Sequence, residues 1–366
     1  MGLRAHSVCC ARYSFSRCCL FLLAGCLCLA LVACGAGMPG SSTAPAPSPT
    51  PTPPSPPSNA PTITAPAAGA SVQSPVLFTG SVASTPNADH SRLLLDGTSI
   101  FYGGILPMKN KWMFIPNGQH TLTLTAYDKS DSPVGSTSIN IDISGQISPA
   151  PMSKLQDTPA WQSCTQDLSG TVCASGLGQA TTSQTQNLST PSLSGASTEY
   201  SLGGKTGYSN ALWWISLGGG TQLNTFTYDL DFYIDNADAT EALEFDVNQS
   251  YGGTRFTWGT ECSFKNTHFW DVWNPLTEAW VPTTVPCNPV TSNQWHHLTW
   301  QFNKVNDEVH YISITLDGVT SPVNMSFPPQ PNWNQEDIDI AFQMDGNYNQ
   351  TPYNVWLDNV TLSASY

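Results

Sequence analysis

The segment EALEFDVNQ, residues 241–249, carries acidic groups at a spacing that suits chemistry on a sugar. Its polar residues Glu244, Asp246 and Asn248 alternate with apolar ones, so in a β-strand their side chains share one face. Two carboxyl groups about 5 to 5.5 Å apart can cleave a glycosidic bond with retention, and carboxylates and amides also bind sugar hydroxyls. We therefore assign these three residues to a candidate carbohydrate-binding site.

The second candidate feature is an aromatic-rich stretch, WGTECSFKNTHFWDVWNPLTEAW, which spans residues 258–280. Aromatic rings stack on the apolar faces of sugar rings, while neighbouring polar groups bond the hydroxyls. We assign Trp258, Trp270 and Trp273 to the binding surface. A place in the hydrophobic core is the alternative for each of them, and we expect that place for Trp300, which lies on an apolar strand face.

Histidine is a third candidate. His296 and His297 are adjacent, so in a strand they point to opposite faces and cannot hold one ion together. His297 falls on the polar face and joins the candidate binding residues. The sequence has no GxSxG or HExxH motif and no glycine-rich phosphate loop, and the glycine run 218–220 is interpreted as a turn between strands.

Period-two alternation in five segments predicts the strands that carry these residues. The segments are 225–235, 243–248, 297–302, 310–316 and 338–345. No stretch of comparable length shows helical spacing. About two hundred residues of strands with one apolar and one polar face predict a large antiparallel β-sandwich over residues 157–366.

These motifs resemble the concanavalin A-like lectin/glucanase superfamily. EALEFDVNQ, NQWHHLTWQF followed by YISITLDG, and a closing NVWLDNVTL occur in the order expected for that group, and WHHLTW with ISITLDG is similar to the laminin-G pattern. The resemblance covers residues 157–366. It implies a jelly roll of two curved sheets with sugar lying across the concave face.

The resemblance also bears on catalysis. In the laminarinase-type glycoside hydrolases of this superfamily, a strand carries Glu-x-Asp-x-Glu, or the same with one more residue before the last Glu; the first Glu is the nucleophile and the last is the acid/base. Glu244 and Asp246 match the first two positions and are the catalytic residues if the protein is an enzyme. Asn248 and Gln249 occupy the places of the last Glu, and an amide cannot deliver a proton. We therefore expect binding without catalysis.

An acid from another strand could restore the missing proton donor. Asp339 and Asp345 are candidates by position. This leaves open a glycoside hydrolase or polysaccharide lyase of the same fold with a rearranged acid/base.

Metal binding is not predicted with any defined ligand set. Legume-type lectins of the superfamily hold metal ions with Glu-Phe-Asp and further Asn and Asp ligands downstream, but the continuation VNQSYGGTRF offers Asn248 and no second Asp. No cofactor is assigned. A structural calcium ion is left open, with Asp229, Asp231 and Asp358 as candidates by composition, and solvated acids on strand faces are the alternative.

Composition restricts the class of ligand. The 366 residues include 12 Lys and Arg against 26 Asp and Glu, a formal net charge of −14, and 21 of those acids and eleven of the twelve Trp lie after residue 156. So acidic a chain cannot neutralise a run of phosphates, which excludes nucleic acid as a partner. An acidic, aromatic domain suits a neutral or cationic sugar.

Residues 60–145 predict a smaller sandwich ahead of the large one. Short apolar runs alternate with turn signals such as Asp96-Gly97, and residues 118–128 alternate over a whole strand. The Asp-Gly turn and the stretch GxHxLxLxAxD resemble the immunoglobulin-like modules of secreted bacterial proteins that act on polysaccharides or adhere to surfaces. We expect His120 to cap a turn, the module to be a spacer, and residues 146–156 to be a linker.

The first residues predict export. Residues 1–33 contain three Arg, an apolar run and no acid, as in a bacterial signal peptide. The run ends in LVACG, which resembles the lipobox of bacterial lipoproteins and implies acylation of Cys34, a membrane anchor and, because Gly35 follows, the outer membrane of a Gram-negative bacterium; a signal cut elsewhere is the alternative. The Pro-rich residues 34–59 predict an extended tether.

Four of the 11 Cys lie beyond the lipobox, and an even number in an exported chain suggests two disulfides. The simplest pairing is Cys164 with Cys173 and Cys262 with Cys287, although three pairings are open. A zinc site is the rival interpretation, but no CxxC pair is present.

The sequence thus predicts an all-β chain with an immunoglobulin-like β-sandwich followed by a concanavalin A-like jelly-roll sandwich. The leading hypothesis is a surface-tethered lipoprotein that binds polysaccharide without cleaving it. The alternatives are an enzyme of the same fold, and an adhesive or structural cell-surface protein.

Overall fold

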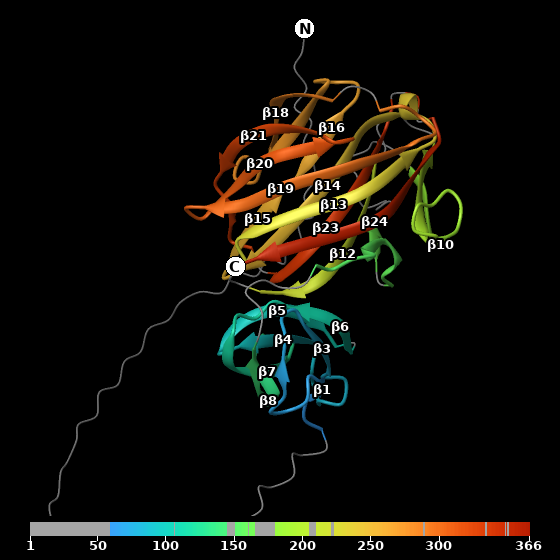
Figure 1. Cartoon of the computed structure of the whole chain (residues 1–366). Coiled ribbons are helices and arrows are strands. Elements are labelled where there is room, and N and C mark those ends of the chain that lie inside the picture. The colour runs from blue at the N-terminus through green and yellow to red at the C-terminus, as the bar shows by residue number, and fades with distance from the viewer. Residues whose placement is uncertain are drawn as a thin grey trace, which may run out of the picture. The chain divides into compact units, whose positions relative to one another are not determined.

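A computed structural model describes residues 59–366, apart from 106, 145–150, 160, 165–179, 205–209, 221–222, 288–289, 334, 348 and 350. Within these ranges the regular elements are strands, except for short 3-10 turns at Leu155–Asp157 and Ala237–Ala239. The all-β prediction is confirmed (Figure 1). The same ranges contain no helix that is long and apolar enough to cross a membrane. The predicted signal peptide, Cys34 and the tether up to residue 58 lie outside the described residues.

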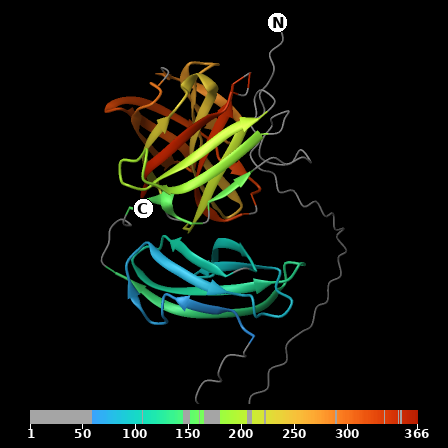
Figure 2. The same ribbon diagram turned by 90° about the vertical axis from the view of Figure 1, so that its right-hand side faces the viewer.

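The larger sandwich consists of two sheets packed face to face (Figures 1 and 2). One sheet contains the run β12-β23-β14-β16-β17-β18, which continues beyond β12 into β6, β3 and β1, and the other has the order β10-β11-β24-β13-β19-β20-β21. The first set comprises β12 (Asn210–Gly219), β23 (Asp337–Gly346), β14 (Thr240–Tyr251), β16 (Thr260–Ser263), β17 (Phe269–Asn274) and β18 (Ala279–Pro286). The second comprises β10 (Ala180–Leu188), β11 (Ser197–Gly204), β24 (Tyr353–Ser365), β13 (Thr225–Ile234), β19 (Trp295–Val305), β20 (Glu308–Leu316) and β21 (Val319–Phe327). Shorter strands β9 (Gln162–Cys164), β15 (Thr254–Trp258) and β22 (Gln330–Pro331) add to the first sheet.

The core lies between these two sheets and follows from the alternation in the sequence. Leu243, Phe245 and Val247 of β14 are buried in one hydrophobic cluster with the apolar residues of β13, β19 and β23. Trp300 is fully buried in that cluster, as predicted. The polar residues between them therefore point out of the opposite side of each sheet.

The smaller sandwich has its own apolar core, formed by residues between Val76 and Ile143. Its five-stranded sheet runs β2-β8-β7-β4-β5. His120 bonds Asp96 Oδ2 at 2.7 Å and the Pro116 carbonyl at 2.9 Å, so it braces the Asp-Gly turn as expected. The strands are β1 (Thr62–Ala65), β2 (Ser71–Val72), β3 (Val76–Ser81), β4 (His90–Leu95), β5 (Thr98–Gly104), β6 (Met108–Met113), β7 (Gly118–Tyr127) and β8 (Pro133–Ile143).

The glycine run 218–220 is not a turn between strands, which corrects the prediction. Gly218 and Gly219 end β12 and pair in parallel with Trp112 and Met113 of β6. Gly218 has φ +146°, and a Cβ there would lie 1.5 Å from the Trp112 carbonyl oxygen. Glycine is required because the two backbones approach too closely for a side chain.

Candidate functional site

The polar face of the β12–β18 sheet carries an unusual number of carboxylates, and we call it the acidic face. Its side chains alternate with core residues on five strands, so they project from the side opposite the core. Most of them are less than a tenth exposed. The carboxylates of the acidic face are Glu244, Asp246, Glu261, Asp271, Asp337, Asp339 and Asp345.

Three of these acids lie in one row across adjacent strands. Glu244 is directly opposite Gln343 on one side and Glu261 on the other, and Glu261 is opposite Asp271. Like charges that face one another across a ladder are destabilising. Such a row does not stabilise the fold, and it therefore indicates a candidate functional site on this face.

Glu244 and Asp345 are two buried carboxyl groups that lie close together. Gln343 Nε2 donates to Glu244 Oε1 and, at 3.2 Å, to Asp345 Oδ1. Burial, and then repulsion by Asp345, raises the pKa of Glu244 well above its ordinary value, and Glu244 donates a hydrogen bond to Asp345. Burial raises the pKa of Asp345 to about 7. Each of these two carboxyl groups therefore holds its proton more strongly than an exposed acid does.

Glu261 and Asp271 repeat this arrangement one strand further on. Burial raises the pKa of Glu261 well above its ordinary value, with repulsion by Asp345 and Asp271 adding to the effect. Burial raises the pKa of Asp271 to about 6, although hydrogen bonds from Thr267, at 2.8 Å, and from Glu261 oppose the rise. Two acid pairs therefore stand side by side on the acidic face.

Asp246 lies next to this row and is partly exposed. Its Oδ1 accepts a 3.1 Å hydrogen bond from the backbone N–H of Thr260. Burial raises its pKa to about 7, while the Thr260 bond and the charge of Arg255 lower it. Asn248 Nδ2 donates to Asp339 Oδ1 at 2.8 Å further along the same face. The structure therefore places Glu244, Asp246 and Asn248 on one face, as the alternation predicts.

Two Trp residues border the acids. Trp273 lies on the acidic face because Val272, its neighbour, belongs to the core. Its side chain is only 3% exposed, which corrects its assignment as a stacking ring and leaves it as the support of Trp280. It stands directly opposite Trp280 of β18, with ring centroids 5.1 Å apart. A Cβ placed on Gly259 would meet Trp273 Cβ at 2.9 Å and Asp246 Oδ1 at 3.4 Å, so ring and carboxylate flank the same glycine. Trp280 is partly exposed and was not among the predicted residues.

Trp258 and Trp270 do not belong to this surface, which corrects their assignment. They are 0% and 1% exposed and lie in the core cluster. Trp258 packs on Phe226 at 5.0 Å, and Trp270 meets Trp300 edge-on at 5.6 Å. Both occupy the apolar phase of their strands, and that phase decides against a role in stacking on sugar.

His297 also lies away from the acidic face. It belongs to β19 in the opposing sheet, where it contacts Asp231 at 2.8 Å and Asp229 at 3.2 Å. Two sheets packed face to face turn their polar faces in opposite directions, so the whole core separates His297 from Glu244. His296 points inward and is 3% exposed, which confirms that the adjacent histidines face opposite ways.

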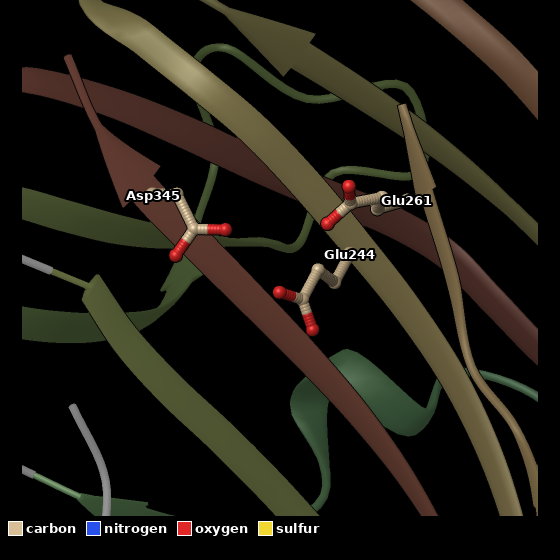
Figure 3. Close-up of side chains that lie close together, drawn as sticks. All are labelled: Glu244, Glu261 and Asp345. Carbon is tan, nitrogen blue, oxygen red and sulfur yellow. The ribbon is translucent and has the colours of Figure 1, made fainter. Parts of the chain in front are cut away.

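One set of acids could hold a metal ion. Single carboxylate oxygens of Glu244, Glu261 and Asp345 all lie within 4.8 Å of one another. Figure 3 shows these three side chains grouped around a common space, carried by different strands. Oxygen ligands of this type suit a hard cation such as calcium.

The acids that composition suggested for calcium are engaged elsewhere. Asp358 is fully buried, and its Oδ2 accepts hydrogen bonds from Ser192 Oγ at 2.7 Å and from the backbone N–H groups of Leu193 and Ser194. Asp229 and Asp231 contact His297. These contacts anchor a loop and a histidine and give all three acids a structural role.

The disulfide between Cys262 and Cys287 is present, as predicted. It ties β16 to the end of the segment that contains β17 and β18. Cys164 is disulfide-bonded, and Cys173, its predicted partner, lies outside the described residues.

The acids that sequence reasoning missed came from strands too short to show alternation. Glu261 lies in the four-residue β16, and Asp271 lies between the core residues Trp270 and Val272 of β17. The order apolar, acidic, apolar at residues 270–272 was the only local indication that Asp271 points away from the core. Asp345 reaches Glu244 from the side of Ala242, whereas the residue directly opposite Asn248 is Asp339.

No protein-family model matches the chain, and no curated protein matches it. Among solved structures, the chain is similar to a carbohydrate-binding module of the β-sandwich superfamily, at 10% identity and a TM-score of 0.30, covering 83% of this chain and 98% of that one. It is also similar to an endo-β-1,4-glucuronan lyase from the fungus Trichoderma reesei, at 14% identity and a TM-score of 0.34, covering 55% and 94%. The chain is also similar to the alginate lyase Aly36B, at 13% identity and a TM-score of 0.36, covering 58% of this chain and 96% of that one. Likenesses at this level carry no argument about function, which rests on the residues of this chain.

Proposed function

We propose that the protein binds polysaccharide on the acidic face of its larger sandwich. The observation that carries the proposal is the row Glu244, Glu261 and Asp271, in strict register and flanked by Trp273 and Trp280. Carboxyl groups that bond hydroxyls, next to rings that stack on the sugar, are the two elements of a glycan site. A face built for stability alone would not set acids opposite one another.

Binding to a panel of insoluble polysaccharides and to a glycan array tests the proposal. Trp280→Ala should weaken binding by at least about tenfold, which corresponds to about 1.4 kcal/mol. Trp356→Ala is the matched control, because Trp356 is also partly buried but lies on the opposing sheet beside Tyr233. Equal loss in both variants, or no glycan bound by the native protein, contradicts the proposal.

A second candidate is hydrolysis by the Glu244–Asp345 pair. The favouring observation is that their oxygens lie within 4.8 Å, which is shorter than the roughly 6.5 to 9.5 Å separation of inverting enzymes. The pKa of both carboxyl groups is raised, as a general acid that works near neutral pH requires. Release of reducing ends from any bound polysaccharide, abolished by Glu244→Gln, would establish catalysis; binding without release would establish a non-catalytic protein.

We further propose that the protein is exported and anchored in the outer membrane through acylated Cys34, with residues 34–59 as the tether and the smaller sandwich, taken as immunoglobulin-like, as a spacer. The lipobox-like LVACG supports this proposal. Metabolic labelling with an alkyne fatty acid should mark the native protein and leave Cys34→Ser unlabelled. Equal labelling of both, or none of either, contradicts the anchor.

A further inference from the structure

The acidic face has many hydrogen-bond acceptors and few donors, and this imbalance indicates a class of sugar. We call Glu244, Glu261, Asp271 and Asp345 the acidic end of the face. We infer, on the basis of the glycan-binding function proposed above, that the acidic end binds the ammonium group of an amino sugar, so that the preferred ligand is a polysaccharide with free amines.

The acidic end has no cationic neighbour of consequence among the described residues. The largest electrostatic influences on Glu244, Glu261 and Asp345 come from other carboxylates. Arg255 acts on Asp246, Asp337 and Asp339, further along the face. Several acids gathered in a poorly solvated place without a fixed cation leave room for a positive charge that the ligand brings.

Two buried amide oxygens also indicate a ligand that donates hydrogen bonds. Asn248, which lies further along the face beside Asp339, is 2% exposed, and its Oδ1 has no donor in the described part of the chain. Asn210 is directly opposite Asp345 on β12 and donates to it, while its own Oδ1 is buried and likewise without a donor. Buried acceptors are normally satisfied, so a ligand rich in N–H groups is expected here. An ammonium group offers three donors and one positive charge.

The Trp pair decides between an amino sugar and a metal ion. A cation held by Glu244, Glu261 and Asp345 needs only oxygen ligands. Trp280, which is partly exposed and packs against the buried Trp273, adds an apolar surface next to the acids, and a sugar ring uses that surface while a bare ion does not. An amino sugar uses the acids and the rings together.

Calorimetry on the full mature chain, with EDTA present, tests the inference. The probes are glucosamine oligosaccharides and N-acetylglucosamine oligosaccharides of equal length, at about pH 6, where a free sugar amine is protonated. The amine form should bind at least about tenfold more tightly, as expected for a charge-assisted hydrogen bond.

Glu244→Gln and Asp345→Asn should each lower the affinity for the amine form towards that for the acetylated form. Asp238→Asn is the control, because the Asp238 side chain is fully exposed. Thermal unfolding establishes that each variant is folded, and both substitutions remove a buried ionisable group. If one variant does not fold, the other provides the comparison, and the preference of the native protein between the two probes is independent of both.

The calorimetric results distinguish the inference from the proposed function. Equal affinity for both probes overturns the inference and leaves the proposed glycan binding intact. Failure to bind either probe or any other polysaccharide removes the proposed function as well. Binding that requires added calcium and is equal for the two probes overturns the inference in favour of a metal ion between the three acids.

Discussion

The acidic end should make the protein less stable as the pH rises through neutrality. Burial raises the pKa of Asp345 from 3.8 to about 7. The folded state therefore binds this proton more tightly than the unfolded state, so the contribution to stability is complete below about pH 4 and is lost as the pH rises through about 7. A rise from 3.8 to about 7 corresponds to about 4 kcal/mol, which is an upper bound because Asp345 also interacts with Glu244.

Asp345→Asn isolates this contribution. An amide cannot ionise, but it also accepts the hydrogen bond from Glu244 less well, at a cost of about 1 kcal/mol. The variant should therefore be about 2 to 3 kcal/mol more stable than the native protein at about pH 8 and at most about 1 kcal/mol more stable at about pH 5. Urea unfolding at both pH values, with the disulfide intact, measures the difference.

Asp238→Asn provides the baseline for this comparison, since its side chain is fully exposed. It should leave the pH dependence of the native protein unchanged. The reasoning is refuted if the free energy of unfolding of the native protein does not fall between about pH 5 and about pH 8, or if Asp345→Asn keeps the native slope.

Three further predictions follow from the placement of single residues. Trp258→Ala should lower the free energy of unfolding in urea by about 3 to 5 kcal/mol, because the ring is fully buried in the core. Trp280→Ala should lower it by less than about 1.5 kcal/mol and should instead weaken glycan binding. Similar losses of stability would contradict the placement of the two rings. His297→Gln should lower the melting temperature more at about pH 5 than at about pH 8. Burial lowers the pKa of His297, but Asp231 and Asp229 outweigh burial and raise it, so the stabilisation is present at low pH and is lost as the pH rises. Glycan binding should not change, and a loss of binding would return His297 to the site. Cys262→Ser should cost about 3 kcal/mol, because the disulfide closes a separation of 25 residues; an unchanged unfolding midpoint under oxidising conditions would refute this.

The course of the strands and the side to which each residue points could be predicted from the sequence. Side chains alternate with a period of two, so the apolar phase of β14 fixed Leu243 in the core and Glu244 on the polar face. The same reasoning correctly buried Trp300. It failed for Trp258 and Trp270, where the abundance of aromatic residues suggested a surface although their strands turn those rings inward.

The membership of the site could be predicted only in part. Glu244, Asp246 and Asn248 lie on one strand, so local periodicity was enough to group them. Gln343 is 99 positions from Glu244 in the chain, yet it stands directly opposite it and links it to Asp345. No local pattern specifies which residues face one another across neighbouring strands.

The sequence by itself determined that the chain is all-β, that its acids and Trp residues are concentrated after residue 156, and that the acids of β14 share a face. Only the tertiary structure decided that Glu261 and Asp345 join Glu244 and that His297 does not. The physical reason is that pairing register and the choice of sheet depend on packing between strands far apart in the chain, whereas the direction of a side chain depends only on its own strand.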